Sequence, residues 1–171
     1  MHYADVFYHG DGGLRLYARD YPGPHNDAPV VLCLPGLTRN SKDFALLADH
    51  LRQNHRVICP DQRGRGRSER DTDPANYRPD VYVRDSWRLG EVIGLRSFSI
   101  VGTPLGGLMA ILMTMQSPDR VDRVVLNDVG PEIDPRGIAR IAGYVGKSAP
   151  VTTWEEAARQ TATINGGAFP E

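Results

Sequence analysis

The sequence predicts an α/β fold, in which helices flank a mostly parallel sheet of about six strands. Short apolar runs, of the kind that are buried on both faces of a parallel sheet, alternate with stretches whose apolar residues recur at helical spacing. The apolar runs cover residues 30–34, 56–60, 98–101 and 123–127. Strands and helices in alternation are typical of βαβ units, so we expect these strands to be parallel.

A hairpin precedes these units. Residues 3–8 and 14–19 alternate in polarity, and the segment 9–13 between them, with three glycines, tolerates the positive φ of a tight turn. Helical spacing predicts helices over 41–54, 79–95, the run after Gly107, 135–145 and 153–163. The last helix has Thr152 or Thr153 as its N-cap residue and two glutamates in its first turn.

Composition bounds the class of protein. The 171 residues are 40% hydrophobic and 24% charged, which is ordinary for a globular domain. The formal net charge of −1 gives no overall field that favours nucleic acid or an anionic membrane. Residues 1–5 lack the basic and apolar regions of a signal peptide, and no stretch is long enough to span a bilayer. We therefore expect a cytoplasmic protein without a membrane partner.

Cys33 and Cys59 are the only cysteines, and each lies inside an apolar, strand-like run. Buried thiols that pack as small hydrophobic side chains account for both of them. No Cys-x-x-Cys spacing and no nearby group of histidines points to a metal site. We expect neither a metal ion nor another cofactor.

Four arginines in one loop raise the alternative of nucleic-acid binding, because glycine-spaced arginines can contact phosphates. They are Arg63, Arg65, Arg67 and Arg70. Acidic residues follow at once, and no aromatic residue is interleaved for stacking on bases. The order of motifs along the chain accounts for this pattern better, so we expect no nucleic-acid partner.

Three motifs follow the predicted strands in order. Leu34-Pro35-Gly36-Leu37 ends the first buried strand, and Asp61-Gln62-Arg63-Gly64-Arg65-Gly66-Arg67-Ser68 follows the second. Gly102-Thr103-Pro104-Leu105-Gly106-Gly107 follows the third and is similar to a nucleophile elbow, the strand-to-helix turn in which G-x-S-x-G exposes a serine. In this order the motifs resemble those of the α/β-hydrolase fold family, in its branch of esterases and carbon–carbon bond hydrolases, over essentially the whole chain.

The resemblance implies roles for several positions. Gly36 lies in the loop of the oxyanion hole, whose two donors match the backbone N–H groups of Leu37 and Leu105. Pro104 occupies the position of the nucleophilic serine. Asp128, just after the strand 123–127, matches a position that some members use for the catalytic acid, and a helix-capping or loop role also accounts for it.

Two departures from the family pattern predict that the sequence as written has no hydrolase activity. Pro104 lacks a hydroxyl, and loss of the serine nucleophile costs another hydrolase on the order of a millionfold in kcat. All five histidines precede the elbow, whereas the family places its histidine after the nucleophile and the acid.

Proline at position 104 also changes the backbone of the elbow. The family nucleophile has a positive φ, whereas proline holds φ at about −65°, so the turn must relax. We expect Thr103 and Pro104 to become the N-cap and first residue of a helix, a favoured start to which the cap contributes about 1 kcal/mol. The fold then tolerates Pro104 while the chemistry does not.

The resemblance also divides the chain. Residues 1–131 match the N-terminal part of the α/β-hydrolase core, and residues 132–171 match the start of a helical cap, within which we expect the chain to be truncated. Three interpretations of function stay open: a disabled copy of a hydrolase for a small ester, lactone or carbon–carbon bond; a non-catalytic binder of an apolar carbonyl or ester ligand; or an incomplete or erroneous sequence of an active hydrolase with serine at position 104.

The predicted strand 123–127 has a consequence for self-association. The strand order of the family would leave it as an exposed, apolar edge of the sheet in this chain. Exposed edges of this kind pair with strands of other chains. We therefore expect self-association through this edge.

Overall fold

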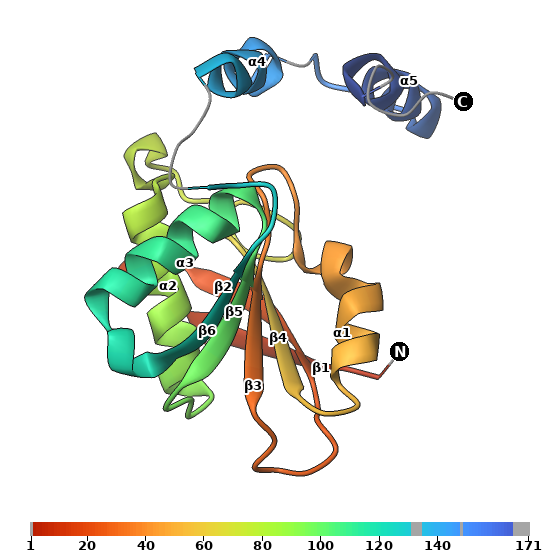
Figure 1. Ribbon diagram of the computed structural model, residues 1–171. Coiled ribbons are helices and arrows are strands. Elements are labelled where there is room, and N and C mark those ends of the chain that lie inside the picture. The colour runs from red at the N-terminus through yellow and green to blue at the C-terminus, as the bar shows by residue number, and fades with distance from the viewer. Residues whose placement is uncertain (1, 131–134, 148, 166–171) are drawn as a thin grey trace. The chain divides into compact units, whose positions relative to one another are not determined.

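The computed structural model describes residues 2–130, 135–147 and 149–165 (Figure 1). Contacts divide the chain into two units, residues 1–130 and 131–171, and each is described by itself. The first unit contains a six-stranded sheet. Its strands are β1 (Ala4–His9), β2 (Arg15–Tyr21), β3 (Val30–Leu34), β4 (Arg56–Asp61), β5 (Phe98–Gly102) and β6 (Val121–Leu126).

The strands lie in the order β1-β2-β4-β3-β5-β6. The hairpin partners β1 and β2 are antiparallel, and β2 is also antiparallel to β4. The remaining neighbours are parallel, with Leu32 of β3 paired both to Ile58 of β4 and to Ile100 of β5. This topology confirms the predicted mostly parallel, six-stranded α/β sheet.

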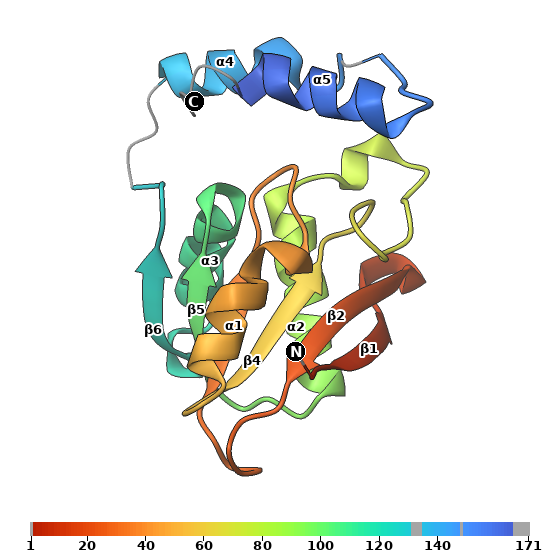
Figure 2. The ribbon, with the colours of Figure 1, turned by 90° about the vertical axis from the view of Figure 1, so that its right-hand side faces the viewer.

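Helices cover both faces of this sheet. Helix α1 (Ala45–Leu51) lies on one face, and α2 (Pro79–Val92) and α3 (Pro104–Gln116) lie on the other, as Figure 2 shows. The side chains of β3 alternate between the two layers, as the period of a strand requires. Leu32 and Leu34 are buried with Met109 of α3, whereas Val31 and Cys33 are buried with Ala48 of α1.

The two cysteines lie side by side within the α1 layer. Because Leu32 pairs with Ile58, Cys33 and Cys59 occupy adjacent positions on β3 and β4, and both are fully buried. Neither forms a disulfide. A hydrogen bond with Cys33 and burial together raise the pKa of the Cys59 thiol well above its ordinary value. The pair therefore packs as small apolar side chains, as predicted.

Several elements differ in extent from the sequence-based expectation: α2, for example, ends at Val92 and not at residue 95. The segment 41–54 is a 3₁₀ turn, Ser41–Phe44, followed by the shorter helix α1. The Asn40 side chain caps Lys42 N–H, and Ser41 N–H donates to the Asp61 carboxylate, so the start of this segment is fixed by partners outside an α-helix. Strand β6 begins earlier than predicted and ends at Leu126, before Asp128 turns into the left-handed region with φ 59°.

The second unit contains helices α4 (Pro135–Tyr144) and α5 (Trp154–Asn165) in its described part. Thr153 Oγ1 accepts a hydrogen bond from Glu156 N–H, and the Glu156 carboxylate accepts one from Thr153 N–H. This reciprocal arrangement is a capping box, which places the start of α5 where the sequence indicated it. In the ranges that the structure describes, no helix is long and apolar enough to cross a membrane.

Candidate active site

All three motifs lie at one edge of the sheet. They follow β3, β4 and β5, which are neighbouring parallel strands, so their carboxyl ends meet at the same edge. In open α/β sheets this edge is where ligands bind. The fold therefore brings together Gly36, Leu37, the loop 61–68 and the elbow (residues 102–107), which are separated widely in the sequence.

The elbow depends on glycines where α3 crosses the ends of β5 and β3. A Cβ on Gly102 would lie 2.5 Å from the backbone of Gly106, and a Cβ on Gly106 would collide with the carbonyl of Leu34. Neither position has room for a side chain, because backbone atoms cannot yield as the end of a flexible side chain can. These glycines fix the approach of the helix to the sheet, as in the family motif.

Pro104 is the first residue of α3, and Thr103 precedes it in an extended conformation with φ −89° and ψ 165°. Among the described residues, only Asp128 has a positive φ without being glycine, so position 104 is not in the left-handed region of a family nucleophile. The relaxed turn that proline requires is thus the one that forms. It is closed by a 2.8 Å hydrogen bond from Gly107 N–H to the Thr103 carbonyl.

The expected side-chain cap from Thr103 does not form. Thr103 occupies the N-cap position, but its Oγ1 donates to the carbonyl of Leu34 over 3.3 Å, and no side-chain cap hydrogen bond is made. Thr103 N–H donates to the same carbonyl over 3.1 Å. The residue ties the elbow to the end of β3, and the cap contribution of about 1 kcal/mol that such a threonine can make is absent.

The loop after β3 lies against the elbow. A Cβ on Gly36 would be 3.6 Å from Thr103 Oγ1 and 3.9 Å from Pro104 Cδ. A hydrogen bond from Arg39 N–H to the Gly36 carbonyl closes a turn over residues 36–39, in which Leu37 is the second residue. Within the described ranges, no backbone acceptor pairs with the N–H of Leu37 or with that of Leu105 in the first turn of α3.

Asp128 also lies at the carboxyl edge of the sheet. It follows β6, the strand next to β5, and the elbow follows β5. Asn127 N–H donates to the Gly102 carbonyl, which continues the β5–β6 pairing just past the strand. Asp128 follows in a left-handed turn and is exposed, and no hydrogen bond or ion pair joins its carboxylate to any described residue. No histidine lies near Asp128 in the sequence, so the Asp128 carboxylate has no such neighbour to orient.

The loop 61–68 is held by its own side chains. The buried Asp61 carboxylate accepts hydrogen bonds from Ser41 N–H and Arg67 N–H, over 2.7 and 2.8 Å. A Cβ on Gly66 would collide with this carboxylate. Ser68 Oγ donates to the Asp61 carbonyl and accepts from Tyr17 N–H, so its hydroxyl is used in the fold and is no substitute nucleophile.

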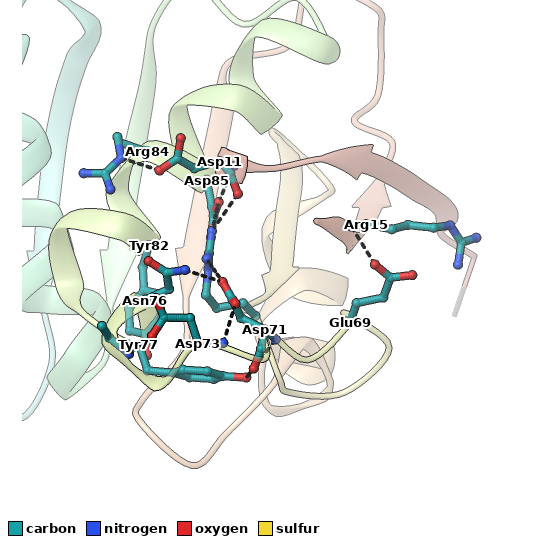
Figure 3. Close-up of polar contacts among 12 residues, drawn as sticks. Asp11, Arg15, Glu69, Asp71, Asp73, Asn76, Tyr77, Tyr82, Arg84 and Asp85 are labelled. Atoms are coloured by element: carbon teal, nitrogen blue, oxygen red, sulfur yellow. Dashed lines mark hydrogen bonds and ion pairs between the residues drawn. The ribbon is translucent and has the colours of Figure 1, made fainter. Parts of the chain in front are cut away.

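Arg63 is the centre of a buried ionic cluster, which sequence reasoning did not find. Its guanidinium is 1% exposed and donates to both carboxylate oxygens of Asp85 in α2, over 2.8 and 2.7 Å. It also donates to Asp71 over 2.7 Å and to the Asp11 carbonyl. Figure 3 shows Asp71 gathered with Asn76 and Tyr77 on one side of this cluster, away from Asp85. The cluster joins the hairpin turn, the loop and α2.

Burial raises the pKa of the Asp85 carboxyl, while the Arg63 guanidinium and Asp11 N–H act in the opposite direction. Two of the other three arginines of the loop also have partners in the fold. Arg65 donates to the Leu37 carbonyl and to Tyr82 Oη, and Arg67 pairs with Asp5. These contacts account for three of the four arginines without a nucleic acid.

A shallow cleft of about 560 Å³ lies at the other end of the sheet. Its lining includes Asp20 near the end of β2, His25 in the loop before β3 and Arg56 at the start of β4. It therefore belongs to the amino ends of the parallel strands. No serine, threonine or cysteine lines it. In the part of the chain that the structure describes, no group of three or more potential metal ligands gathers.

Comparison with protein families decides the lineage. The family model described as alpha/beta hydrolase fold matches residues 29–169 of this chain. The chain belongs to the α/β-hydrolase fold family. The matched range contains all three motifs of the carboxyl edge.

Curated relatives of the chain include named hydrolases. It is 34% identical over 151 residues to the 3-hydroxybutyrate-oligomer hydrolase of Cupriavidus necator, an alignment that covers 88% of this chain and 51% of that protein. It is 35% identical over 92 residues to the 2-hydroxymuconate semialdehyde hydrolase of a Pseudomonas species, with 54% of this chain and 32% of that protein covered. The chain therefore spans about half or less of the length of these relatives.

Solved structures agree with this assignment. An α/β hydrolase from Novosphingobium aromaticivorans superimposes with a TM-score of 0.87 at 45% sequence identity, over 94% of this chain and 56% of that one. A putative hydrolase from Rickettsia typhi gives a TM-score of 0.85 at 23% identity, over 97% of this chain and 62% of that one, and supports the fold alone.

Proposed function

We propose that this α/β-hydrolase chain binds carbonyl compounds of the short-ester class at its carboxyl edge and does not hydrolyse them. One observation supports the proposal: Pro104 is the first residue of α3, and a Cβ on Gly36 would lie 3.9 Å from Pro104 Cδ, so the loop after β3 lies against the elbow. The oxyanion-hole donors that the resemblance implies are backbone N–H groups, which Pro104 does not remove, and proline has no hydroxyl to attack a carbonyl carbon.

The proposed binding step depends on two backbone N–H groups, which a change of side chain does not remove. A carbonyl oxygen between the N–H groups of Leu37 and Leu105 would accept hydrogen bonds from both, and backbone donors survive a change of side chain at position 35 or 104. Without an attacking hydroxyl the carbonyl carbon stays planar, and no acyl-enzyme forms. The ligand leaves unchanged, so the site is one of binding alone.

The ester class rests on the relatives. The Cupriavidus necator protein, aligned over 88% of this chain, is named for 3-hydroxybutyrate oligomers, which are linear polyesters. We therefore propose short hydroxyalkanoate esters as the ligand class of this chain. Lactones and the substrates of carbon–carbon bond hydrolases share the carbonyl group and form the comparison set for a binding assay.

Two measurements test the two halves of the proposal. We expect no covalent labelling of the chain by a fluorophosphonate probe, because no residue that the structure describes supplies an activated nucleophile. We expect saturable binding of the methyl ester of the 3-hydroxybutyrate dimer, measured by calorimetry, and no binding of the matching ether that lacks the carbonyl oxygens. Labelling of the chain overturns the loss of catalysis, and equal binding of ester and ether overturns the role of the oxyanion loop.

A pair of variants isolates the backbone donor. Leu37→Pro removes one N–H at the second position of a turn, where proline is favoured, so the fold should be kept. Leu37→Ala keeps the N–H and is the matched control for loss of the side chain. We expect Leu37→Pro to weaken ester binding about tenfold, since a hydrogen bond contributes about 1 kcal/mol or more, and Leu37→Ala to bind more tightly than Leu37→Pro.

Sequencing of the source gene tests the alternative interpretation, in which the given sequence is an incomplete or erroneous copy of an active hydrolase. A serine codon at position 104, with an open frame that supplies a later aspartate and histidine, would make the protein a complete hydrolase and overturn the proposal. A proline codon at that position supports it. Serine and proline codons can differ by a single base, so this sequencing is decisive for position 104.

A further inference from the structure

The two cysteines belong to a row of side chains that crosses the sheet on the face where α1 packs. Arg19 of β2 pairs with Asp5 of β1 on one side and with Cys59 of β4 on the other. Cys33 of β3 is the next residue of the row. Figure 2 shows β1, β2 and β4 side by side in this order. The fold thus places a cation directly beside a pair of thiols.

The guanidinium of Arg19 is buried without an ion pair among the described residues. Arg19 is only 9% exposed, and its buried Nε donates no hydrogen bond to any described residue. Its Nη1 donates to Tyr21 Oη over 3.4 Å. The carboxylate of Asp5, its neighbour in the row, is paired with Arg67 instead. A buried charge is costly unless it has a partner, so this guanidinium can still accept an anion in the row.

The missing partner of Arg19 has to come from inside the row. Because Arg19 Nε is already enclosed by described residues, a further length of chain could reach it only by displacing them. Both cysteines are likewise fully buried by residues of this chain. Cys59 is the neighbour that can become an anion, since a thiol that loses its proton is a thiolate and an adjacent arginine favours that form.

We propose that Cys59 and Cys33 are a modification site, a dithiol that hydrogen peroxide oxidises to a disulfide, with Arg19 beside the attacking Cys59 thiolate. Cys33 is the resolving thiol. Adjacent residues on neighbouring strands have Cα atoms about 4.8 Å apart, which is within the range that a disulfide spans. The site is separate from the carboxyl edge, and it does not depend on the binding of esters there.

The reaction consumes one molecule of hydrogen peroxide. The Cys59 thiolate attacks one peroxide oxygen, the O–O bond breaks, and the sulfur becomes a sulfenic acid while hydroxide leaves and takes up the proton that the thiol released. The sulfur of Cys33 then attacks the sulfenic sulfur, an S–S bond forms, and the sulfenic hydroxyl leaves as water with the proton of the Cys33 thiol. The two thiols lose two electrons in all, and the peroxide is reduced to two molecules of water.

Burial makes this oxidation slow. A hydrogen bond with Cys33 and burial raise the pKa of the Cys59 thiol, and Arg19 acts in the opposite direction. Peroxide reaches the pair only when the structure opens locally, because both cysteines are fully buried. Where opening and closing are fast, the rate depends on the open fraction multiplied by the thiolate fraction. Arg19 raises the second factor, since its strand pairing keeps it opposite Cys59.

The first test treats the folded chain with millimolar hydrogen peroxide and maps disulfides by mass spectrometry without reduction. We expect a disulfide between Cys33 and Cys59 of the same chain, reversed by dithiothreitol, while circular dichroism shows that the fold is kept. No disulfide in the folded chain, a disulfide that forms only in denaturant, or linkage between separate chains overturns the proposal.

Two single variants assign the roles of the thiols. Cys33→Ala lacks the resolving thiol, so we expect its Cys59 to accumulate as a sulfenic acid, which dimedone labels. Cys59→Ala keeps only the thiol that is one strand further from Arg19. We expect several-fold less dimedone labelling in Cys59→Ala. Equal labelling of the two variants overturns the assignment of Cys59 as the attacking thiol.

Arg19→Met tests the cation. We expect disulfide formation to slow about tenfold, because less of Cys59 is then thiolate, and Arg19→Lys to keep most of the rate. A fold loosened by the substitution would expose the thiols and speed their oxidation, so damage to the structure cannot imitate this result. Arg15→Met is the matched control, because Arg15 is an exposed arginine on the same face of β2, opposite His9. An unchanged or faster rate in Arg19→Met, or equal slowing in Arg15→Met, overturns the role of Arg19.

Discussion

Arg65 donates a hydrogen bond from its Nε to the Leu37 carbonyl over 3.0 Å, and so ties the loop after β4 to the loop after β3. The same guanidinium donates to the Arg63 carbonyl and to Tyr82 Oη. A peptide unit whose carbonyl is held in this way cannot turn freely, so Arg65 positions the loop without being a catalytic residue.

We expect Arg65→Met to destabilise the fold by about 1–3 kcal/mol, because a hydrogen bond from a charged donor is lost at a half-buried site. Ester binding should weaken as well, since the turn at Leu37 loses its anchor. Denaturant unfolding and calorimetry measure the two effects. Arg70→Met is the control, because Arg70 is exposed and has no ion-pair partner among the described residues; equal effects of both substitutions would remove Arg65 from this role.

The buried pair Arg63–Asp85 predicts a large loss of stability when one partner is removed. We expect Asp85→Asn to cost about 3 kcal/mol, the lower end of the range for a broken buried pair, because the buried guanidinium keeps only Asp71 as a carboxylate partner. The double variant Arg63→Met, Asp85→Asn should recover part of this loss, since no buried guanidinium remains and Asp71, which loses its cation, is partly exposed. Additive losses in denaturant unfolding of the single and double variants would show that the two side chains act independently.

Asp71 predicts a loss of stability in acid. The Asp73 N–H lowers the pKa of this carboxyl below its ordinary value of 3.8, burial opposes the shift, and Asn76 and Arg63 lower it further. A carboxyl whose pKa is lower in the folded state stabilises the fold above its unfolded pKa, and this contribution is lost as pH falls through the folded value. The loss should therefore begin near pH 3.8 and continue below it.

Thermal unfolding of Asp71→Asn against pH checks this contribution. We expect the variant to be less stable than the unchanged chain at neutral pH, and the difference to shrink as the pH falls below 3.8. Asp43→Asn, which removes an exposed carboxylate from a 3.6 Å pair with Arg39, is the control. A difference between Asp71→Asn and the unchanged chain that stays constant with pH would contradict the assignment.

Much of the fold was predictable because its signals are local. The apolar run of β3 is readable from five consecutive residues, and its predicted bounds are those of the strand. The glycines of the elbow indicate a close crossing, and Gly102 and Gly106 have no room for a side chain. Strand β6 was placed two residues too late because the charged Asp122 separates Val121 from the apolar run, although Val121 still pairs with Phe98.

The contacts of side chains far apart in the sequence were less predictable. Arg63 and Asp85 are 22 residues apart, and nothing in the loop motif selects Asp85 over the acidic residues that directly follow the loop. Thr103 was expected to cap α3, but the Leu34 carbonyl, which the fold brings to it from 69 residues away, takes its hydroxyl instead. A local pattern indicates which groups need partners, and the tertiary structure decides which partners they obtain.

Pro104→Ser tests whether the nucleophile alone would restore activity, and we expect that it would not. A catalytic base must be within hydrogen-bond reach of the serine. His25 lines the cleft at the amino ends of the parallel strands. His9 ends β1, four strands from β5, which at the spacing of neighbouring strands is about 19 Å. Neither histidine can take the proton of a serine at position 104.

The stability of Pro104→Ser should change by about 1 kcal/mol or less, because proline at the first helical position mainly restricts the unfolded chain. Fluorophosphonate labelling and ester hydrolysis should stay at the level of Pro104→Ala, the matched control that has no hydroxyl. Labelling of Pro104→Ser above that level would show that the chain supplies a base, and would place the loss of activity in this single residue.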